Sequence, residues 1–180
     1  MRYQWLATVA SVPTVMVAPA YAVTYFSPAE VQQKFFPEAA QFVSKPVVMD
    51  AALRRKIEQQ SQARFYKPVS AVKALDAAGK HLGWVLIDNV IGKHDFITYA
   101  VSLSTQGTIQ GIEILNYRES YGGQVRNQGW RGQFVGKTMN QPIKVHQDIK
   151  NISGATLSCV HVADGVRKLL ALHQQVLQAL

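Results

Sequence analysis

The feature that most constrains the fold is a period-two alternation of apolar side chains across residues 69–117. Alternation of this kind is typical of β-strands that bury one face. Short turn sequences such as Ala78-Gly79-Lys80 divide the stretch into four predicted strands: 69–75, 81–90, 96–104 and 109–115. Because connections this short join antiparallel neighbours, the sequence predicts an antiparallel meander.

Helical patterns flank the meander on both sides. Ser27-Pro28-Ala29-Glu30 has the residues of a helix start, with Ser as N-cap, Pro at the first helical position and Glu at the third. We expect that helix to end before Pro37, and a second helix to span 50–62. From Leu157 onward, apolar residues recur at steps of three and four, which predicts a long amphipathic helix. With a short helix around 127–134, the fold class is α+β.

The composition is that of a globular chain with a basic surface. Of 180 residues, 48% are hydrophobic and 17% charged, which excludes a disordered chain and a coiled coil. The net charge of +8 favours acidic partners, but no run of five basic residues occurs, so we expect no nucleic-acid partner. The single cysteine, Cys159, excludes an intramolecular disulfide. The histidines lack the spacing of metal ligands, so we expect no metal site.

The amino terminus has the order of features found in secretory signals. Arg2 precedes an uncharged stretch that ends in Ala20-Tyr21-Ala22, which matches the positive, apolar and small-residue regions of a signal peptide. We expect residues 1–22 to be removed after Ala22 and the mature protein to be periplasmic. The alternative is an uncleaved membrane anchor, against which Pro13 and Pro19 argue because each would kink a spanning helix.

The residues before the last predicted helix suggest a phosphate site. Ser153-Gly154-Ala155-Thr156 lies where the unpaired N–H groups and the positive end of the helix dipole would point. Such a terminus suits a phosphate group. Gly154 permits close approach of the backbone to the phosphate, and Ser153 and Thr156 supply two hydroxyls. The same residues allow a second interpretation, in which Ser153 or Thr156 simply caps the helix and no ligand binds.

The wider segment resembles the FMN-binding domain family, which includes the C subunit of the sodium-translocating NADH:quinone oxidoreductase and the G subunit of the Rnf electron-transport complex. In that family a Ser-Gly-Ala-Thr motif carries FMN esterified through its phosphate to the Thr hydroxyl, and residues 153–156 match it residue for residue. The similarity covers about 69–170. Its upstream parts are Thr105-Gln106-Gly107, 109–115, Glu119-Ser120-Tyr121-Gly122, Trp130, Phe134 and Gly136-Lys137.

The resemblance implies a covalent flavoprotein, with FMN joined by a phosphoester to Thr156. The remaining cofactor-binding residues that it implies are Ser153, Gly154, Ala155, Glu119, Ser120, Tyr121 and Gly122. It also implies a flavin transferase as the partner that attaches the cofactor. One position departs from the family pattern, since the usual Asp six residues before the Thr is Lys150 here. The chain is then divided into a signal peptide (1–22), an N-terminal helical segment (23–68) and the FMN-binding domain (69–180).

The expected function is electron transfer rather than an enzymatic reaction on a substrate. No pair of proton-transfer residues and no motif for an organic substrate accompanies the phosphate site. We expect a periplasmic electron carrier that works between a membrane or periplasmic redox partner and an acceptor. The rival hypothesis is an accessory module that holds FMN or another phosphate ligand without a covalent bond. For Tyr121 and Trp130, packing on the isoalloxazine ring and packing within the protein both remain open.

Overall fold

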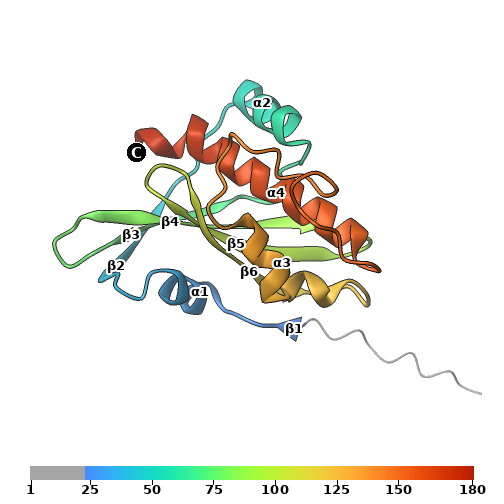
Figure 1. Cartoon of the computed structure of the whole chain (residues 1–180). Coiled ribbons are helices and arrows are strands. Elements are labelled where there is room, and N and C mark those ends of the chain that lie inside the picture. Colours follow the sequence, from blue (N-terminus) through green and yellow to red (C-terminus); the bar gives the residue numbers. More distant parts are fainter. Residues whose placement is uncertain (1–22) are drawn as a thin grey trace, which may run out of the picture.

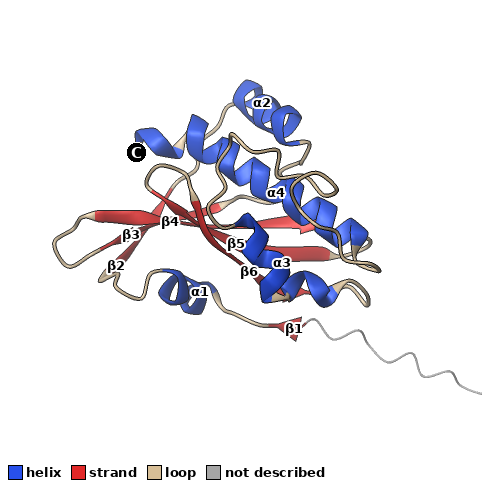
Figure 2. Ribbon diagram, viewed as in Figure 1, coloured by secondary structure: helices blue, strands red, loops and turns tan. Residues whose placement is uncertain are grey.

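The computed structural model describes residues 23–180, and the predicted signal peptide lies outside them. Six strands form one sheet in the order β1-β6-β5-β4-β3-β2. The elements are β1 (Val23–Thr24), α1 (Pro28–Phe35), β2 (Gln41–Lys45), α2 (Ala51–Ser61), β3 (Ser70–Leu75), β4 (His81–Ile91), β5 (Phe96–Ser104), β6 (Ile109–Tyr117), η1 (Gly123–Arg126), α3 (Gln128–Arg131), η2 (Gly132–Phe134), α4 (Thr156–Gln175) and η3 (Leu177–Ala179). Figure 2 shows them coloured by type.

The predicted meander and the α+β fold class are confirmed. Strands β3 to β6 pair in sequence order, each antiparallel to the next. The alternation places side chains such as Leu86 and Val101 on one face, where both are fully buried. Strand β6 extends beyond the predicted end at Leu115 as far as Tyr117, which brings the sheet directly to the loop that follows.

The segment 23–68 is not purely helical, so that part of the sequence prediction is wrong. Helices α1 and α2 form as expected, but β2 pairs with β3 and β1 pairs with β6. Both edges of the sheet therefore come from this segment. The two strands are short, and their backbone hydrogen bonds are made with strands distant in the sequence. A local periodicity spanning two to five residues is too brief to predict such strands.

The helix starts follow the capping chemistry of the sequence. Ser27 accepts a hydrogen bond from the amide of Glu30, whose carboxylate accepts one from the amide of Ser27 at 2.7 Å. This is the predicted capping box. Asp50 caps α2 by accepting from the amide of Leu53 at 2.7 Å, and the helix ends at Gln62 in a left-handed conformation.

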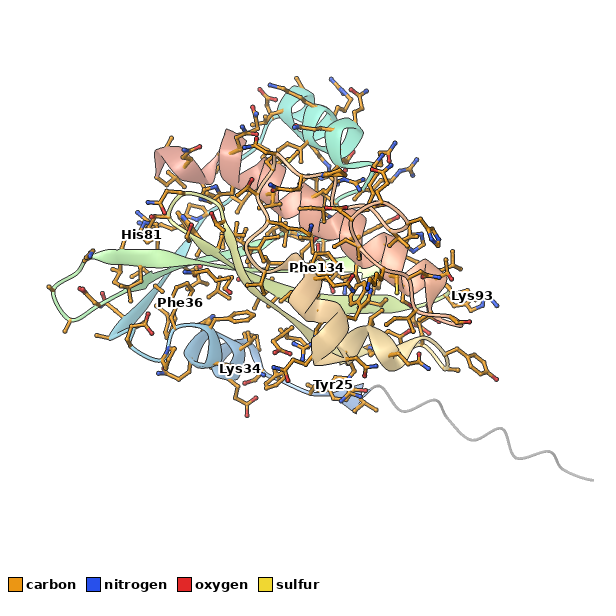
Figure 3. All side chains as sticks on the ribbon, viewed as in Figure 1. Tyr25, Lys34, Phe36, His81, Lys93 and Phe134 are labelled. Atoms are coloured by element: carbon orange, nitrogen blue, oxygen red, sulfur yellow. The ribbon has the colours of Figure 1, made fainter. Side chains whose placement is uncertain are left out.

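Helices cover both faces of the sheet (Figure 1). Helix α4 lies across one face, with α2 packed against it, and α1 lies on the opposite face. The larger hydrophobic cluster fills the space under α4, and a smaller cluster lies under α1. Figure 3 shows Phe134 and Phe36 on opposite sides of the sheet, as members of the two clusters.

A buried ion pair fixes α4 over the sheet. The ammonium of Lys168 lies 2.8 Å from the Asp88 carboxylate, and both side chains are fully buried. The hydroxyl of Tyr99 donates to the same carboxylate oxygen at 2.8 Å, and Lys168 also donates to the carbonyl of Arg64 at 2.6 Å. Burial, and then the neighbouring carboxylate, raise the pKa of Tyr99. Removing either charge would leave the other unpaired in the interior.

Within residues 23–180, no helix combines the length and the hydropathy needed to cross a bilayer.

Candidate functional site

The first turn of α4 offers unpaired backbone amides. Ala155 occupies the N-cap position, and its carbonyl accepts the first helical hydrogen bond, from Cys159 at 2.9 Å. The amides of Thr156, Leu157 and Ser158 precede that bond and have no partner within the helix. Among the residues that the structure describes, no side chain caps α4. The interpretation in which Ser153 or Thr156 caps the helix is therefore wrong, because the turn before α4 makes Ala155 the N-cap and Thr156 the first helical residue.

A tight turn leads into this helix. The amide of Ala155 donates to the carbonyl of Ile152 at 3.0 Å, and Gly154 has a φ of 80°. That left-handed conformation is easily adopted only by glycine. A Cβ atom built on Gly154 would have no atom within 4 Å, so the space over the turn is open. Ser153 and Gly154 are consequently exposed to solvent beside the free amides.

The hydroxyl of Thr156 is exposed and has one neighbour of special interest. It accepts a hydrogen bond from the side-chain amide of Asn151 at 2.9 Å. The backbone just before Asn151 is held on both sides, since the Lys150 amide donates to Gln133 at 2.7 Å and its carbonyl accepts from the Trp130 indole at 2.8 Å. The side chain of Lys150 remains exposed.

The structure brings the loop 119–122 against the first turn of α4. Gly122 has a φ of 89°, and a Cβ there would lie 2.6 Å from the Tyr117 hydroxyl and 2.9 Å from Ser158 Oγ. Tyr117 donates to the carbonyl of Tyr121 at 2.5 Å and lies 2.9 Å from Ser158 Oγ. The two predicted parts of the site, distant in sequence, are thus adjacent through Gly122 and Ser158.

Glu119 is directed at the turn between β4 and β5. Its carboxylate accepts the backbone amides of His94 at 2.5 Å and Asp95 at 2.9 Å. Burial opposes ionisation of this carboxyl, but the hydrogen bonds from the turn outweigh it and lower the pKa of Glu119. The same turn is tied to α4, because His161 Nδ1 lies 3.0 Å from the carbonyl of Gly92. Figure 3 shows Lys93 of this turn projecting outward near the first part of α4.

Glu119 therefore holds the turn between β4 and β5 to the loop that follows β6. Its contact with a cofactor stays a prediction. The other side chains of its loop face solvent: Ser120 is exposed, and Tyr121 is 85% exposed. An aromatic ring this open is free to cover a ligand or a partner protein.

The candidate aromatic residue Trp130 and two arginines near it, Arg126 and Arg131, make contacts within the fold. Trp130 is only 4% exposed and packs within the core. Arg131 forms an ion pair with Glu113 at 2.5 Å. Arg126 lies over the ring of Tyr25, 3.4 Å from its centroid. These contacts explain each side chain without an external ligand.

A hollow of about 540 Å³ lies beside this site. Its lining residues are Asn127, Gly129, Trp130, Gln133, Lys150, Asn151 and Ile152. Because Asn151 contacts Thr156, the hollow adjoins the predicted attachment residue. Another hollow, of about 530 Å³, lies beside β2 and includes none of the predicted site residues. Over residues 23–180, no three His, Cys, Asp or Glu side chains gather where they could hold a metal ion.

Comparison with known families identifies the domain in which this candidate site lies. Residues 92–171 match the family model described as the FMN-binding domain. The chain carries an FMN-binding domain. The matched region includes the loop 119–122, the turn before α4 and Thr156, so the resemblance noted from residues 153–156 is confirmed, and FMN is the cofactor that the family indicates.

Solved structures agree with this domain in fold. NqrC of Shewanella oneidensis is 16% identical, with a TM-score of 0.52 over 79% of this chain and 86% of that chain. The C subunit of the Na⁺-translocating NADH-quinone reductase from Parabacteroides distasonis is also 16% identical, with a TM-score of 0.50 over 83% of each chain. At this identity the similarity concerns the fold alone. No curated protein matches the sequence.

Sequence reasoning missed the residues that join the parts of this site. Tyr117 and Ser158 are 41 positions apart, and they meet because α4 packs across the sheet. Asn151 precedes Thr156 by five residues. A polar amide so close to the motif was visible in the sequence, but its direction depends on the turn at Gly154.

Proposed function

We propose that this protein is a periplasmic flavoprotein electron carrier with FMN esterified through its phosphate to Thr156. One observation carries the proposal. Thr156 presents an exposed hydroxyl at the first position of an uncapped helix, inside a region that matches the FMN-binding domain. A phosphate on that hydroxyl would meet the free amides of the first helical turn.

The residues around Thr156 suit an anionic group. The amides of Leu157 and Ser158 and the positive end of the α4 dipole would stabilise the phosphate charge. The exposed turn at Gly154 leaves room for it, and the Ser153 hydroxyl is available as a further donor. When bound, FMN supplies one- or two-electron transfer. The protein residues hold it, set its electrostatic surroundings and leave it accessible to partners.

The proposed partners follow from the redox role. Solved structures with this fold include a subunit of an NADH-quinone reductase, which supports a membrane or periplasmic redox protein as donor or acceptor. A flavin transferase in the same compartment would attach the cofactor. An ester bond would keep FMN on the carrier in a dilute compartment, where a weakly bound cofactor would be lost.

Export is proposed from the amino-terminal sequence. Intact mass of the protein recovered from the periplasm should correspond to a chain that begins at Val23. A protein that retains residues 1–22 and fractionates with membranes would show the anchored form instead.

The attachment is tested by Thr156→Val with mass spectrometry and acid precipitation. The wild-type protein, produced with a flavin transferase, should gain the mass of FMN and keep its flavin absorbance in the acid pellet. Valine is nearly isosteric but cannot form the ester, so Thr156→Val should lose both signals. Its free energy of unfolding should fall by no more than about 1 kcal/mol, because only one exposed hydrogen bond is removed.

Thr138→Val is the matched control, since Thr138 lies in a loop outside the site and should leave the flavin mass unchanged. Flavin that is released by acid from the wild-type protein would favour the non-covalent accessory module. Acid-stable flavin on Thr156→Val would place the attachment elsewhere.

A further inference from the structure

We propose that Asn151 is a positioning residue that fixes the direction of the Thr156 hydroxyl for ester formation. The inference deepens the proposed function and rests on it. Its starting point is the 2.9 Å hydrogen bond from Asn151 Nδ2 to Thr156 Oγ1.

The direction of this hydrogen bond has a chemical consequence. A threonine hydroxyl has two acceptor lone pairs and one proton. The Asn151 amide occupies one lone pair, which leaves the second lone pair and the proton for other partners. As a β-branched residue at a helix start, Thr156 has few χ1 rotamers to choose from, and one hydrogen bond is enough to favour a single rotamer.

The backbone around Asn151 is held firmly. The preceding Lys150 peptide is bonded through its amide to Gln133 and through its carbonyl to Trp130. After it, the carbonyl of Ile152 accepts the amide of Ala155. These contacts tie the turn before Thr156 to the α3 region. The backbone that carries the Asn151 side chain is therefore held in place.

The other end of the Asn151 amide supports the same role. Its Oδ1 atom is buried and has no hydrogen-bond partner among the described residues. A buried carbonyl oxygen without a hydrogen-bond partner costs free energy. The position of the Asn151 side chain is therefore not explained by a hydrogen bond to its amide oxygen. The contact that the side chain does make is the one with Thr156.

The step that this geometry serves is a phosphoryl-type transfer from a dinucleotide form of FMN. Thr156 Oγ1 forms a bond to the FMN phosphorus, and the phosphoanhydride bond of the donor breaks. The nucleoside monophosphate leaves with the bonding electron pair, and the hydroxyl proton passes to a base of the transferase. Asn151 takes no proton and only holds Oγ1 in the direction of attack.

The experiment compares wild type, Asn151→Leu and the control Asn140→Leu, which changes an exposed asparagine in a separate loop. In the unmodified proteins, three-bond NMR couplings of the Thr156 side chain report its χ1 rotamer. We expect one rotamer in wild type and in Asn140→Leu, and averaging in Asn151→Leu. With transferase and the dinucleotide donor, Asn151→Leu should gain the FMN mass about 5- to 10-fold more slowly, as expected for the loss of one hydrogen bond.

An averaged rotamer in the wild-type protein would overturn the inference, as would an Asn151→Leu variant with the wild-type rate. If wild type gains no FMN mass, the proposed attachment fails, while the couplings still decide whether Asn151 orients the hydroxyl. Should Asn151→Leu fail to give a folded NMR spectrum, Asn151→Ala, which only removes atoms, replaces it in both measurements.

Discussion

The hydroxyl oxygens of Tyr117 and Ser158 lie 2.9 Å apart and join the end of β6 to the first turn of α4. Tyr117 has a single proton, which it donates to the carbonyl of Tyr121. Ser158 must therefore be the donor in the contact between the two hydroxyls. Burial raises the pKa of Tyr117, so its proton stays in place at neutral pH. This chain of hydrogen bonds holds the loop 119–122 beside Thr156.

Tyr117→Phe should loosen that loop. The substitution leaves the Tyr121 carbonyl and the Ser158 hydroxyl without their partner, which should lower the free energy of unfolding by about 1–3 kcal/mol. Urea unfolding measures the loss, and hydrogen exchange should show faster exchange across 118–123. Tyr121→Phe is the control, because that side chain is exposed, and it should stay within about 0.5 kcal/mol of wild type. Equal urea midpoints for Tyr117→Phe and wild type would contradict the role of the hydroxyl.

Lys150→Asp should speed the proposed flavin attachment without changing the fold. The structure uses only the backbone of Lys150, whose side chain is exposed, and the substitution restores the acidic residue that is usual in the family motif. A mass-spectrometric time course with the transferase measures the rate. Lys80→Asp, in the distant turn between β3 and β4, controls for the change of net charge. A time course that matches wild type would mean that the transferase does not read this position.

Glu119→Gln should make stability depend less on pH. A carboxyl whose pKa is lowered by folding stabilises the protein above its unfolded pKa of about 4.3, and this contribution disappears as the pH falls through the folded value. At pH 7 the variant should therefore unfold at lower urea concentration than wild type, and the difference should shrink in acid. Glu38→Gln, at an exposed residue after α1, provides the comparison. A difference that stays constant from pH 7 to pH 3 would show that the turn does not depend on the charge of Glu119.

Lys168→Met should be strongly destabilising. It would leave the Asp88 carboxylate buried without its cation, and breaking a buried pair in this way costs about 3–5 kcal/mol. Adding Asp88→Asn should recover part of the loss, because the uncompensated charge is then removed. Chemical denaturation of the two single variants and the double variant gives the coupling energy. Additive effects would show that the two charges do not depend on each other.

The elements that the sequence predicted well are those whose signals are local. The capping residues Ser27 and Asp50 mark their helices within four positions, and the meander repeats its pattern over many residues. Strand β2 was missed because five residues between two prolines carry little periodicity. Its position depends on pairing with β3, a contact between segments some thirty residues apart along the chain.

The parts of the candidate site also differ in whether their sequence signal is local. The motif at residues 153–156 was visible because the chemistry of a helix start is local. The identity of the N-cap residue was not visible in the sequence, because the turn at Gly154 makes Ala155 the N-cap. The clamp between Tyr117 and Ser158 depends on the packing of the sheet against α4, which no short sequence pattern encodes.

The pairing of β1 with β6 gives Val23, the first residue that the structure describes, a fixed place relative to the candidate site. Val23 lies opposite Tyr117, about 5 Å away across the strands, so the chain enters the fold where the site loop begins (Figure 1). If the preceding segment is cut away, the domain can diffuse with this end unencumbered and meet donor and acceptor in turn. If that segment instead stays in a bilayer, it would attach the domain to the membrane beside the loop that follows β6. A flavin on Thr156 would then reach only partners at the membrane surface.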